Sequence, residues 1–175
     1  MTDYYRFDVE DCKVAAWNSP ENYGQAYDVD AISMLQITLN TVSGVLEGDA
    51  SIKDTHARII SATVRCRFAF SNLDVYGVLT GTNVTDSPTL RRLTFDTNNM
   101  PYFALVAKVP HTQGSGDTHI FIPKLKVMEG FQLSAEYGRY ITPELTMTAV
   151  KEGSVWKVVN IIEHTTAQSL TIPPS

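Results

Sequence analysis

Apolar and polar residues alternate with a period of two along much of this chain of 175 residues, a pattern typical of half-buried β-strands. The clearest run is residues 63–70, in which Arg65 and Arg67 face away from the apolar side chains. Similar alternation, or a short apolar run, predicts further strands at residues 35–39, 41–47, 92–96, 102–109, 120–127 with an interruption at Pro123, 131–137, 145–149 and 155–162.

Local signals predict how several of these elements begin and end. The alternation changes phase at Pro123, which favours a bulge or a crossover between sheets at that point. One short helix is predicted between Ser71, which can cap its first turn, and Gly81, which follows its end, with Asp74 at the capping-box position. Residues 151–153 predict a hairpin turn between the last two strands.

About eight strands and one helix predict a mainly β fold, a β-sandwich or β-barrel with one short flanking α-helix. We expect a single domain over residues 1–175, with its β core at residues 32–165. Residues 1–31 are polar and irregular, so we expect an extended N-terminal arm with little core of its own. Residues 166–175 contain two prolines and predict an extended C-terminal tail.

The composition points away from nucleic acid and membranes and toward assembly. Charged residues make up 19% of the chain, below the share of about a quarter that is usual for soluble domains, which fits surface hidden between subunits. The net charge of −5 disfavours binding to nucleic acid or to an anionic membrane surface. The N-terminus shows no signal-peptide pattern and no apolar run reaches the ~20 residues of a membrane span, so we expect a cytosol-like compartment.

Candidate chemistry is sparse. Cys12 and Cys66 lack the spacing of a metal or redox motif, so we interpret them as reduced structural thiols. The histidines and serines form none of the familiar catalytic motifs. His111, Asp117 and His119 flank one loop and could in principle bind a metal, but we favour solvated loop residues. The sequence therefore predicts no catalytic, cofactor-binding or metal-binding residue, and no enzyme.

The order of elements resembles the tail-tube proteins of long-tailed bacteriophages. A strand pair, a polar loop around residues 48–55, the strong strand at 63–70 and a short helix ending Val78-Leu79-Thr80-Gly81 carry the resemblance. It continues through Pro101-Tyr102-Phe103-Ala104-Leu105, a glycine-rich loop and paired strands, and covers residues 32–165.

The resemblance implies a structural virion protein, assembled in the host cytoplasm and located in the phage tail. Its copies would form hexameric rings that stack, with other tail proteins, into a hollow tube through which genomic DNA passes without specific binding. A long hairpin loop would reach the next ring; on this chain it falls at residues 45–59, and charge reversal of Asp49 with Asp54 should weaken stacking. The candidate contact residues between rings are Glu47, Asp49, Lys53, Asp54 and His56.

Self-assembly also has independent physical support, because edge strands without many lysines invite pairing with a neighbour's edge, and a closed ring uses such edges. Other interpretations remain open. One is another virion component, such as a tail terminator, an adaptor or a capsid decoration protein. Another is a monomeric carbohydrate- or peptide-binding β-sandwich module, which should show a concave patch lined by aromatic residues.

Overall fold

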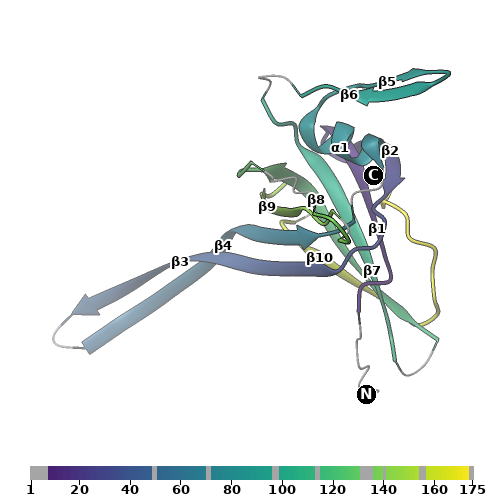
Figure 1. Ribbon diagram of the computed structural model, residues 1–175. Helices are drawn as coiled ribbons and strands as arrows, with labels where there is room; N and C mark the ends of the chain where they lie inside the picture. Colours follow the sequence, from purple (N-terminus) through teal and green to yellow (C-terminus); the bar gives the residue numbers. More distant parts are fainter. Residues whose placement is uncertain are drawn as a thin grey trace.

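The computed structural model describes residues 8–48, 51–69, 72–95, 99–112, 115–130, 136–139, 141–153 and 157–173, with no side chains described at 47, 48 and 51–53. Within these ranges the protein is mainly β, as the alternating pattern predicts, with one α-helix and antiparallel sheets (Figure 1). Among the described residues, no helix is both long and apolar enough to cross a membrane.

The main sheet has the strand order β2-β1-β7-β8-β9-β4-β3, and β10 also pairs with β8. A separate two-stranded sheet pairs β5 with β6 beyond the helix α1 (Figure 1). The elements are β1 (Asp11–Ser19), β2 (Asn22–Asp28), β3 (Met34–Gly48), β4 (Ser51–Arg67), α1 (Leu73–Thr80), β5 (Val84–Ser87), β6 (Leu90–Leu93), β7 (Phe103–Pro110), β8 (Asp117–Val127), β9 (Glu144–Ala149) and β10 (Asn160–His164).

Strand β8 is the branch point of this sheet. Its first half pairs with β10 and its last residues pair with β9. Between these halves the register with β7 shifts, because Phe103 lies opposite Leu125 while Leu105 lies opposite Ile122. The extra residue on β8 falls beside Pro123, so the predicted bulge is confirmed. β9 leads away from this point to β4 and β3, which cross steeply over β1, β7 and β8 (Figure 1).

The sheet has two parts: β2, β1, β7, β8 and β10 form one, and β9, β4 and β3 form the other. The core lies between these two parts, which makes the fold sandwich-like. Strand β7 is buried along most of its length, as expected for a central strand. Helix α1 covers one end of the core and buries Val75, Tyr76 and Leu79. The largest fully buried side chains come from both parts of the sheet and from the helix: Tyr76, Phe103, Phe121, Leu105, Ile122, Leu125, Leu145 and Met147.

The N-terminal segment is not the irregular arm that its polarity suggests. From residue 11 it forms the hairpin β1–β2, and β1 pairs with β7 inside the main sheet. Cys12 and Val14 are buried in the core, while Lys13 between them forms a salt bridge of 3.1 Å with Asp28. A short alternating run was therefore present, but the polar turn around Pro20 and the exposed strand β2 obscured it.

The helix boundaries match the prediction at one end only. Gly81 ends α1 in the left-handed conformation, with φ of 71°, as a C-terminal glycine does. At the other end the cap is Asn72, whose side chain accepts a hydrogen bond of 2.9 Å from the backbone N–H of Asp74. Ser71, the predicted cap, lies outside the described residues.

The last third of the chain also departs from prediction. Residues 136–139 form a turn, while residues 131–135 of the same predicted strand lie outside the described ranges. β10 begins at Asn160 and pairs with β8. The expected hairpin turn at 151–153 is therefore wrong, since among the described residues β9 pairs with β8 and β4 and has no ladder with β10. Pairing with a distant strand overrides the local turn signal.

Candidate assembly surface

The β3–β4 hairpin has two parts with different surroundings. In the inner part, Leu35 to Asn40 pair with Cys66 to Ser61, and Val64 and Cys66 are buried in the core. The register then shifts, because Thr41 lies opposite Ile59 and leaves Ile60 as an extra residue. Such a bulge bends the strand and increases its twist. Beyond it, the outer part projects away from the rest of the molecule (Figure 1).

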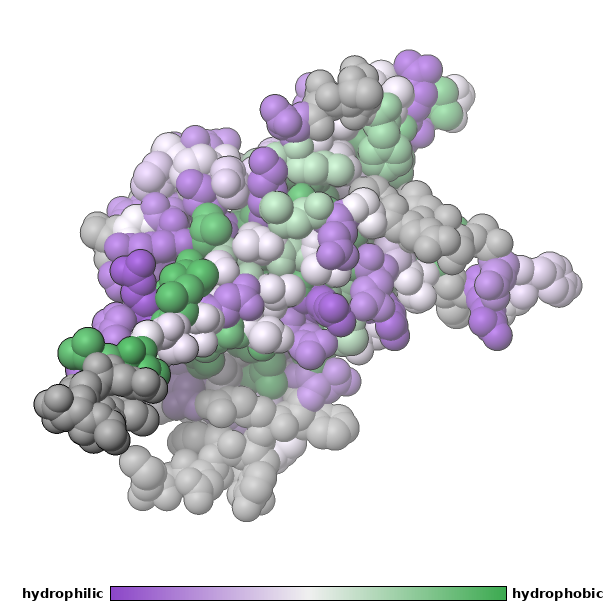
Figure 2. Space-filling model, turned by 90° about the vertical axis from the view of Figure 1, so that its left-hand side faces the viewer, coloured by the Kyte–Doolittle hydropathy of each residue, from purple (hydrophilic) through white to green (hydrophobic). Residues whose placement is uncertain are grey.

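The outer part exposes large apolar side chains that have no core of their own to cover them. Their exposed fractions lie between 47% and 63%, and hydrophobic residues are visible along the hairpin where it points toward the viewer in Figure 2. A two-stranded ribbon alone is marginally stable in water, so these side chains would gain from a covering surface. The apolar residues of this hairpin surface are Val42, Val45, Leu46 and Ile59 in the outer part, Ile60 at the bulge and Leu39 at the end of the inner part.

Strand β3 also forms one edge of the main sheet. It is 15 residues long, contains no proline and has Glu47 as its single charged residue. Proteins usually protect such edges with lysines, prolines, bulges or covering loops. The backbone N–H and C=O groups along the outer side of β3 are therefore suited to pairing with a strand of another chain.

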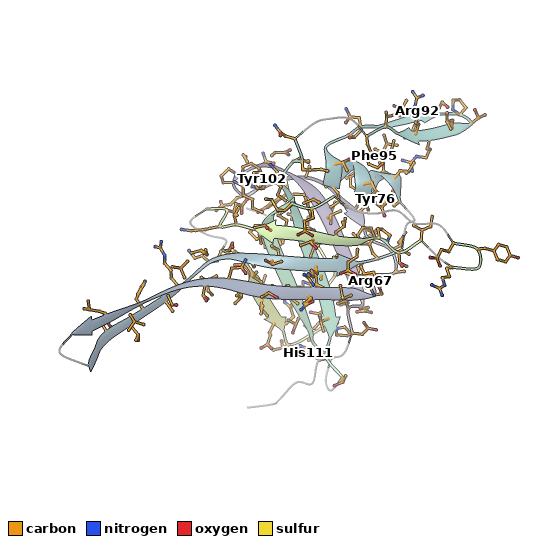
Figure 3. All side chains as sticks on the ribbon, turned by 60° about the vertical axis from the view of Figure 1, so that its left-hand side comes forward. Arg67, Tyr76, Arg92, Phe95, Tyr102 and His111 are labelled. Carbon is orange, nitrogen blue, oxygen red and sulfur yellow. The ribbon has the colours of Figure 1, made fainter. Side chains whose placement is uncertain are left out.

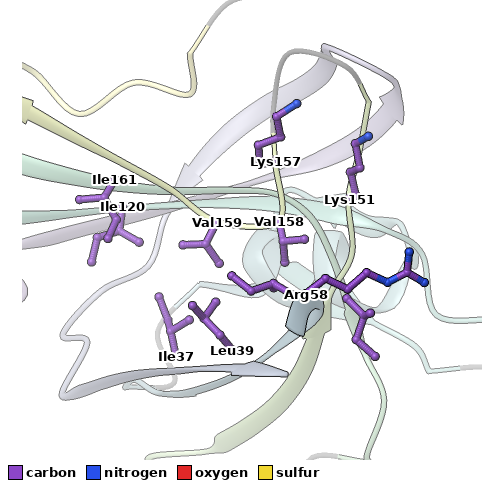
Figure 4. Close-up of a pocket in the computed structure, with 11 residues that line it drawn as sticks. Ile37, Leu39, Arg58, Ile120, Lys151, Lys157, Val158, Val159 and Ile161 are labelled. Atoms are coloured by element: carbon purple, nitrogen blue, oxygen red, sulfur yellow. The ribbon is translucent and has the colours of Figure 1, made fainter. Parts of the chain in front are cut away.

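An apolar groove lies where the hairpin meets the body of the protein (Figure 4). Its volume is about 750 Å³, and Leu39, Ile59 and Ile60 belong to both the groove and the hairpin surface. Three cationic side chains, Arg58, Lys151 and Lys157, also line it. The remaining lining residues come from β3, β8, the segment leading into β10 and β10 itself, and none is aromatic: Ile37, Ile120, Val158, Val159 and Ile161.

The structure places the predicted contact residues on the outer hairpin, as far as it describes them. Residues 45–48 and 51–59, the described part of the long hairpin loop expected at 45–59, form an extended two-stranded ladder. Asp54 and His56 are exposed on β4, opposite Leu46 and Gly44 respectively. Glu47 and Lys53 lie in the ladder near a second register shift, although their side chains are outside the described set, and Asp49 lies outside the described residues altogether.

Sequence reasoning missed the apolar part of this surface. The signal was present in the pair Ile59-Ile60, which breaks the alternation of β4, and in Val42, Val45 and Leu46, which lie on a strand that was interpreted only as half-buried. The groove could not be foreseen, because its walls come from three separate parts of the chain.

The loop residues that were considered as a metal site are also placed differently. They are buried at the end of β7 and the start of β8 instead of being solvated. His111 Nε2 lies 2.9 Å from Thr118 Oγ1, and Asp117 Oδ2 accepts a hydrogen bond of 2.7 Å from the backbone N–H of Gln168. The prediction of solvated loop residues is therefore wrong for His111, Asp117 and His119.

No protein-family model and no curated protein sequence matches this chain. The functional interpretation therefore depends on the geometry of the molecule.

Proposed function

We propose that this protein is a structural subunit that assembles with copies of itself into stacked, hexameric rings, forming the hollow tail tube of a long-tailed bacteriophage. The observation that supports this best is the projecting β3–β4 hairpin, which combines an exposed apolar surface with a long edge strand that contains no proline and a single charged residue. It would act in the virion tail, after assembly in the host cytoplasm, with other tail proteins as further partners and without a cofactor.

The hairpin and the groove are physically complementary. An apolar ribbon that projects from one copy needs an apolar surface to cover it, and the groove at the hairpin base provides such a surface on the next copy. Each copy carries both the β3–β4 hairpin and the groove, so the contact is head-to-tail and can be repeated. Head-to-tail contacts generate closed rings when the rotation closes and open stacks or helices when it does not.

The charge of the chain supports the same function. A net charge of −5 opposes adhesion to the DNA backbone, which suits a channel through which DNA must slide. The polar residues of the outer hairpin, Asp54 and His56 among them, provide hydrogen bonds and ion pairs that can set the register between rings.

The other virion components considered from the sequence would use the same edge and hairpin but would stop at a single ring or at a complex with another protein. The second candidate is a monomeric carbohydrate- or peptide-binding module; the described residues that line the groove include no aromatic side chain on which a sugar could stack, which favours assembly as the use of this groove.

The test is negative-stain electron microscopy of the purified protein, concentrated at neutral pH, with sedimentation velocity on the same sample. Hollow tubes or stacked rings are expected. Single rings that never stack would favour a terminator or adaptor. A protein that stays monomeric even when seeded with tail-tip assemblies would overturn the proposal.

A further inference from the structure

A cluster of three potential metal ligands lies at the end of the sheet opposite α1, where β8 begins and β10 ends. The register pairs Asp117 with His164 and Ile162 with His119. Residues two apart on one strand, and residues directly opposite each other on neighbouring strands, share a face of the sheet. Asp117, His119 and His164 therefore converge on one face, and their potential ligand atoms all lie within 4.8 Å of one another.

Two buried side-chain atoms of this cluster have no hydrogen-bond partner among the described residues. Asp117 is fully buried and His119 is 6% exposed. Within the part of the chain that the structure describes, neither Asp117 Oδ1 nor His119 Nε2 has a hydrogen-bond partner. The two atoms are 3.5 Å apart, longer than the 2.7–3.2 Å typical of N–H···O hydrogen bonds. Buried polar groups in native proteins are normally satisfied, so this pair requires an explanation.

The separation of these atoms is the one that a bound metal would produce. Zinc binds histidine nitrogen and carboxylate oxygen at about 2.0–2.2 Å, so two ligands of a tetrahedral ion lie about 3.4 Å apart. His164 is the third ligand, half-buried on β10, and its ring centroid is 4.6 Å from that of His119. Two imidazoles and one carboxylate, with one open position, form a ligand set that zinc uses.

The charged groups around this cluster leave the space between its three potential ligand atoms available to a cation. Lys108 lies nearby on β7, but its Nζ is 3.2 Å from Glu10 Oε2 and 3.7 Å from Asp117 Oδ2. It therefore faces the other oxygen of the Asp117 carboxylate, and Glu10 offsets its charge.

The backbone also brings the two strands close together here. Gly116 precedes Asp117, and a Cβ at this position would collide with the carbonyl oxygen of His164. Glycine therefore permits the close approach of β10 to the start of β8. His111, labelled in Figure 3, marks this end of the sheet.

We propose that Asp117, His119 and His164 bind one divalent transition-metal ion, with zinc as the ion that best fits the ligand set, and that this ion clips the C-terminal strand β10 to β8. The site is independent of the assembly function, because its ligands lie outside the hairpin and the groove.

The test is isothermal titration calorimetry of the full chain with ZnCl₂ after treatment with EDTA, together with the visible spectrum of the Co²⁺-substituted protein. We expect one zinc ion per chain, intense absorption typical of four-coordinate Co²⁺, and a higher melting temperature with zinc. His164→Ala should weaken zinc binding by at least about tenfold, because even second-shell partners of a metal contribute that much. His56→Ala, which removes an exposed histidine on the hairpin, is the matched control and should bind zinc like the wild type.

Circular dichroism confirms that each variant is folded, and His164→Gln replaces His164→Ala if the latter does not fold. The proposal is overturned if the folded wild-type protein binds no zinc, or if His164 variants bind zinc as tightly as the wild type. Zinc binding that His56→Ala removes would overturn it equally, since the ion would then be on the hairpin. None of these readouts requires the protein to polymerise.

Discussion

The indole Nε1 of Trp17 donates a hydrogen bond of 2.8 Å to Oε1 of Glu152, which joins the end of β1 to the segment that follows β9. The same carboxylate accepts hydrogen bonds from the backbone N–H of Glu21, at 2.9 Å, and from the Tyr23 hydroxyl, at 2.7 Å. Lys124 lies 4.1 Å above the Trp17 ring. One half-buried acidic side chain thus fixes the β1–β2 turn to the rest of the sheet.

Replacing Glu152 should therefore destabilise the protein. Glu152→Ala removes the acceptor for three hydrogen bonds to a charged group, and we expect the free energy of unfolding to fall by about 2 kcal/mol. Urea denaturation followed by tryptophan fluorescence measures this change. Glu136→Ala is the control, since that carboxylate pairs with Arg139 at the exposed surface, and it should leave stability almost unchanged. Equal effects of the two variants would show that Glu152 does not anchor the turn.

Two glycines provide a second matched comparison. Gly81 has φ of 71°, and a Cβ there would lie 3.2 Å from Pro101 Cδ. Gly81→Ala should therefore lower the free energy of unfolding by about 1–2 kcal/mol, because the left-handed conformation is costly for residues with a Cβ. Gly44 has open space around it in the outer hairpin, so Gly44→Ala should be neutral or slightly stabilising. A Gly81→Ala variant as stable as the wild type would mean that the end of α1 relaxes without cost.

Features that depend on nearby residues could be predicted from the sequence, and features that depend on distant pairing could not. The phase change at Pro123 predicted the bulge of β8, and Gly81 predicted the end of α1, since each signal acts on its own stretch of backbone. β1 was missed because its burial depends on β7, far along the chain. The pairing of β10 with β8 was missed for the same reason.

In the candidate sites, too, features set by nearby residues could be predicted and features set by distant pairing could not. Asp54 and His56 are exposed on the hairpin, and their contact with another ring stays a prediction. The groove requires β3, β8 and residues 157–161 to meet, and no local pattern indicates that. Asp117 and His119 were noticed as potential ligands, but His164 joins them only through the β8–β10 register.

The two cysteines should be inert in the folded protein. Burial raises the pKa of Cys66 to about 12 and raises that of Cys12 well above its ordinary value. At pH 8 we therefore expect neither thiol to react with Ellman's reagent until the protein is unfolded in urea, when both should react. Reaction of either thiol in the native protein at a rate like that of a free thiol would show that this part of the core opens readily.

The raised pKa of Cys66 also determines how the free energy of unfolding changes at high pH. The thiol of Cys66 ionises in the unfolded chain near pH 8.5, but in the folded protein only near pH 12. The unfolded state therefore binds fewer protons between these values, and the free energy of unfolding should fall as the pH rises from about 9 toward 12. Cys66→Ala should fall less steeply over this range, measured by urea denaturation at each pH.

Replacing exposed apolar side chains of the outer hairpin should weaken assembly while the protein stays folded. Val42 lies opposite Arg58, and Leu46 lies opposite Asp54. The double variant Val42→Asp/Leu46→Lys therefore removes two exposed apolar side chains, adds no net charge and places opposite charges across the ladder. Because both residues are exposed, we expect the free energy of unfolding to stay within about 0.5 kcal/mol of the wild type. Loss of a mostly apolar contact should raise the concentration required for polymerisation by about tenfold or more, since 1.4 kcal/mol corresponds to a factor of ten.

Sedimentation of polymer across a concentration series, checked by electron microscopy, measures this threshold for assembly. Met128→Lys is the matched control, because Met128 is as exposed as Leu46 but lies at the end of β8, outside the hairpin and the groove. If both variants polymerise at the wild-type concentration, the hairpin surface does not drive assembly. If both lose assembly equally, exposed apolar side chains act without regard to position, and the hairpin has no special role. Loss confined to the hairpin variant, with stability preserved, would identify this ribbon as the contact between subunits.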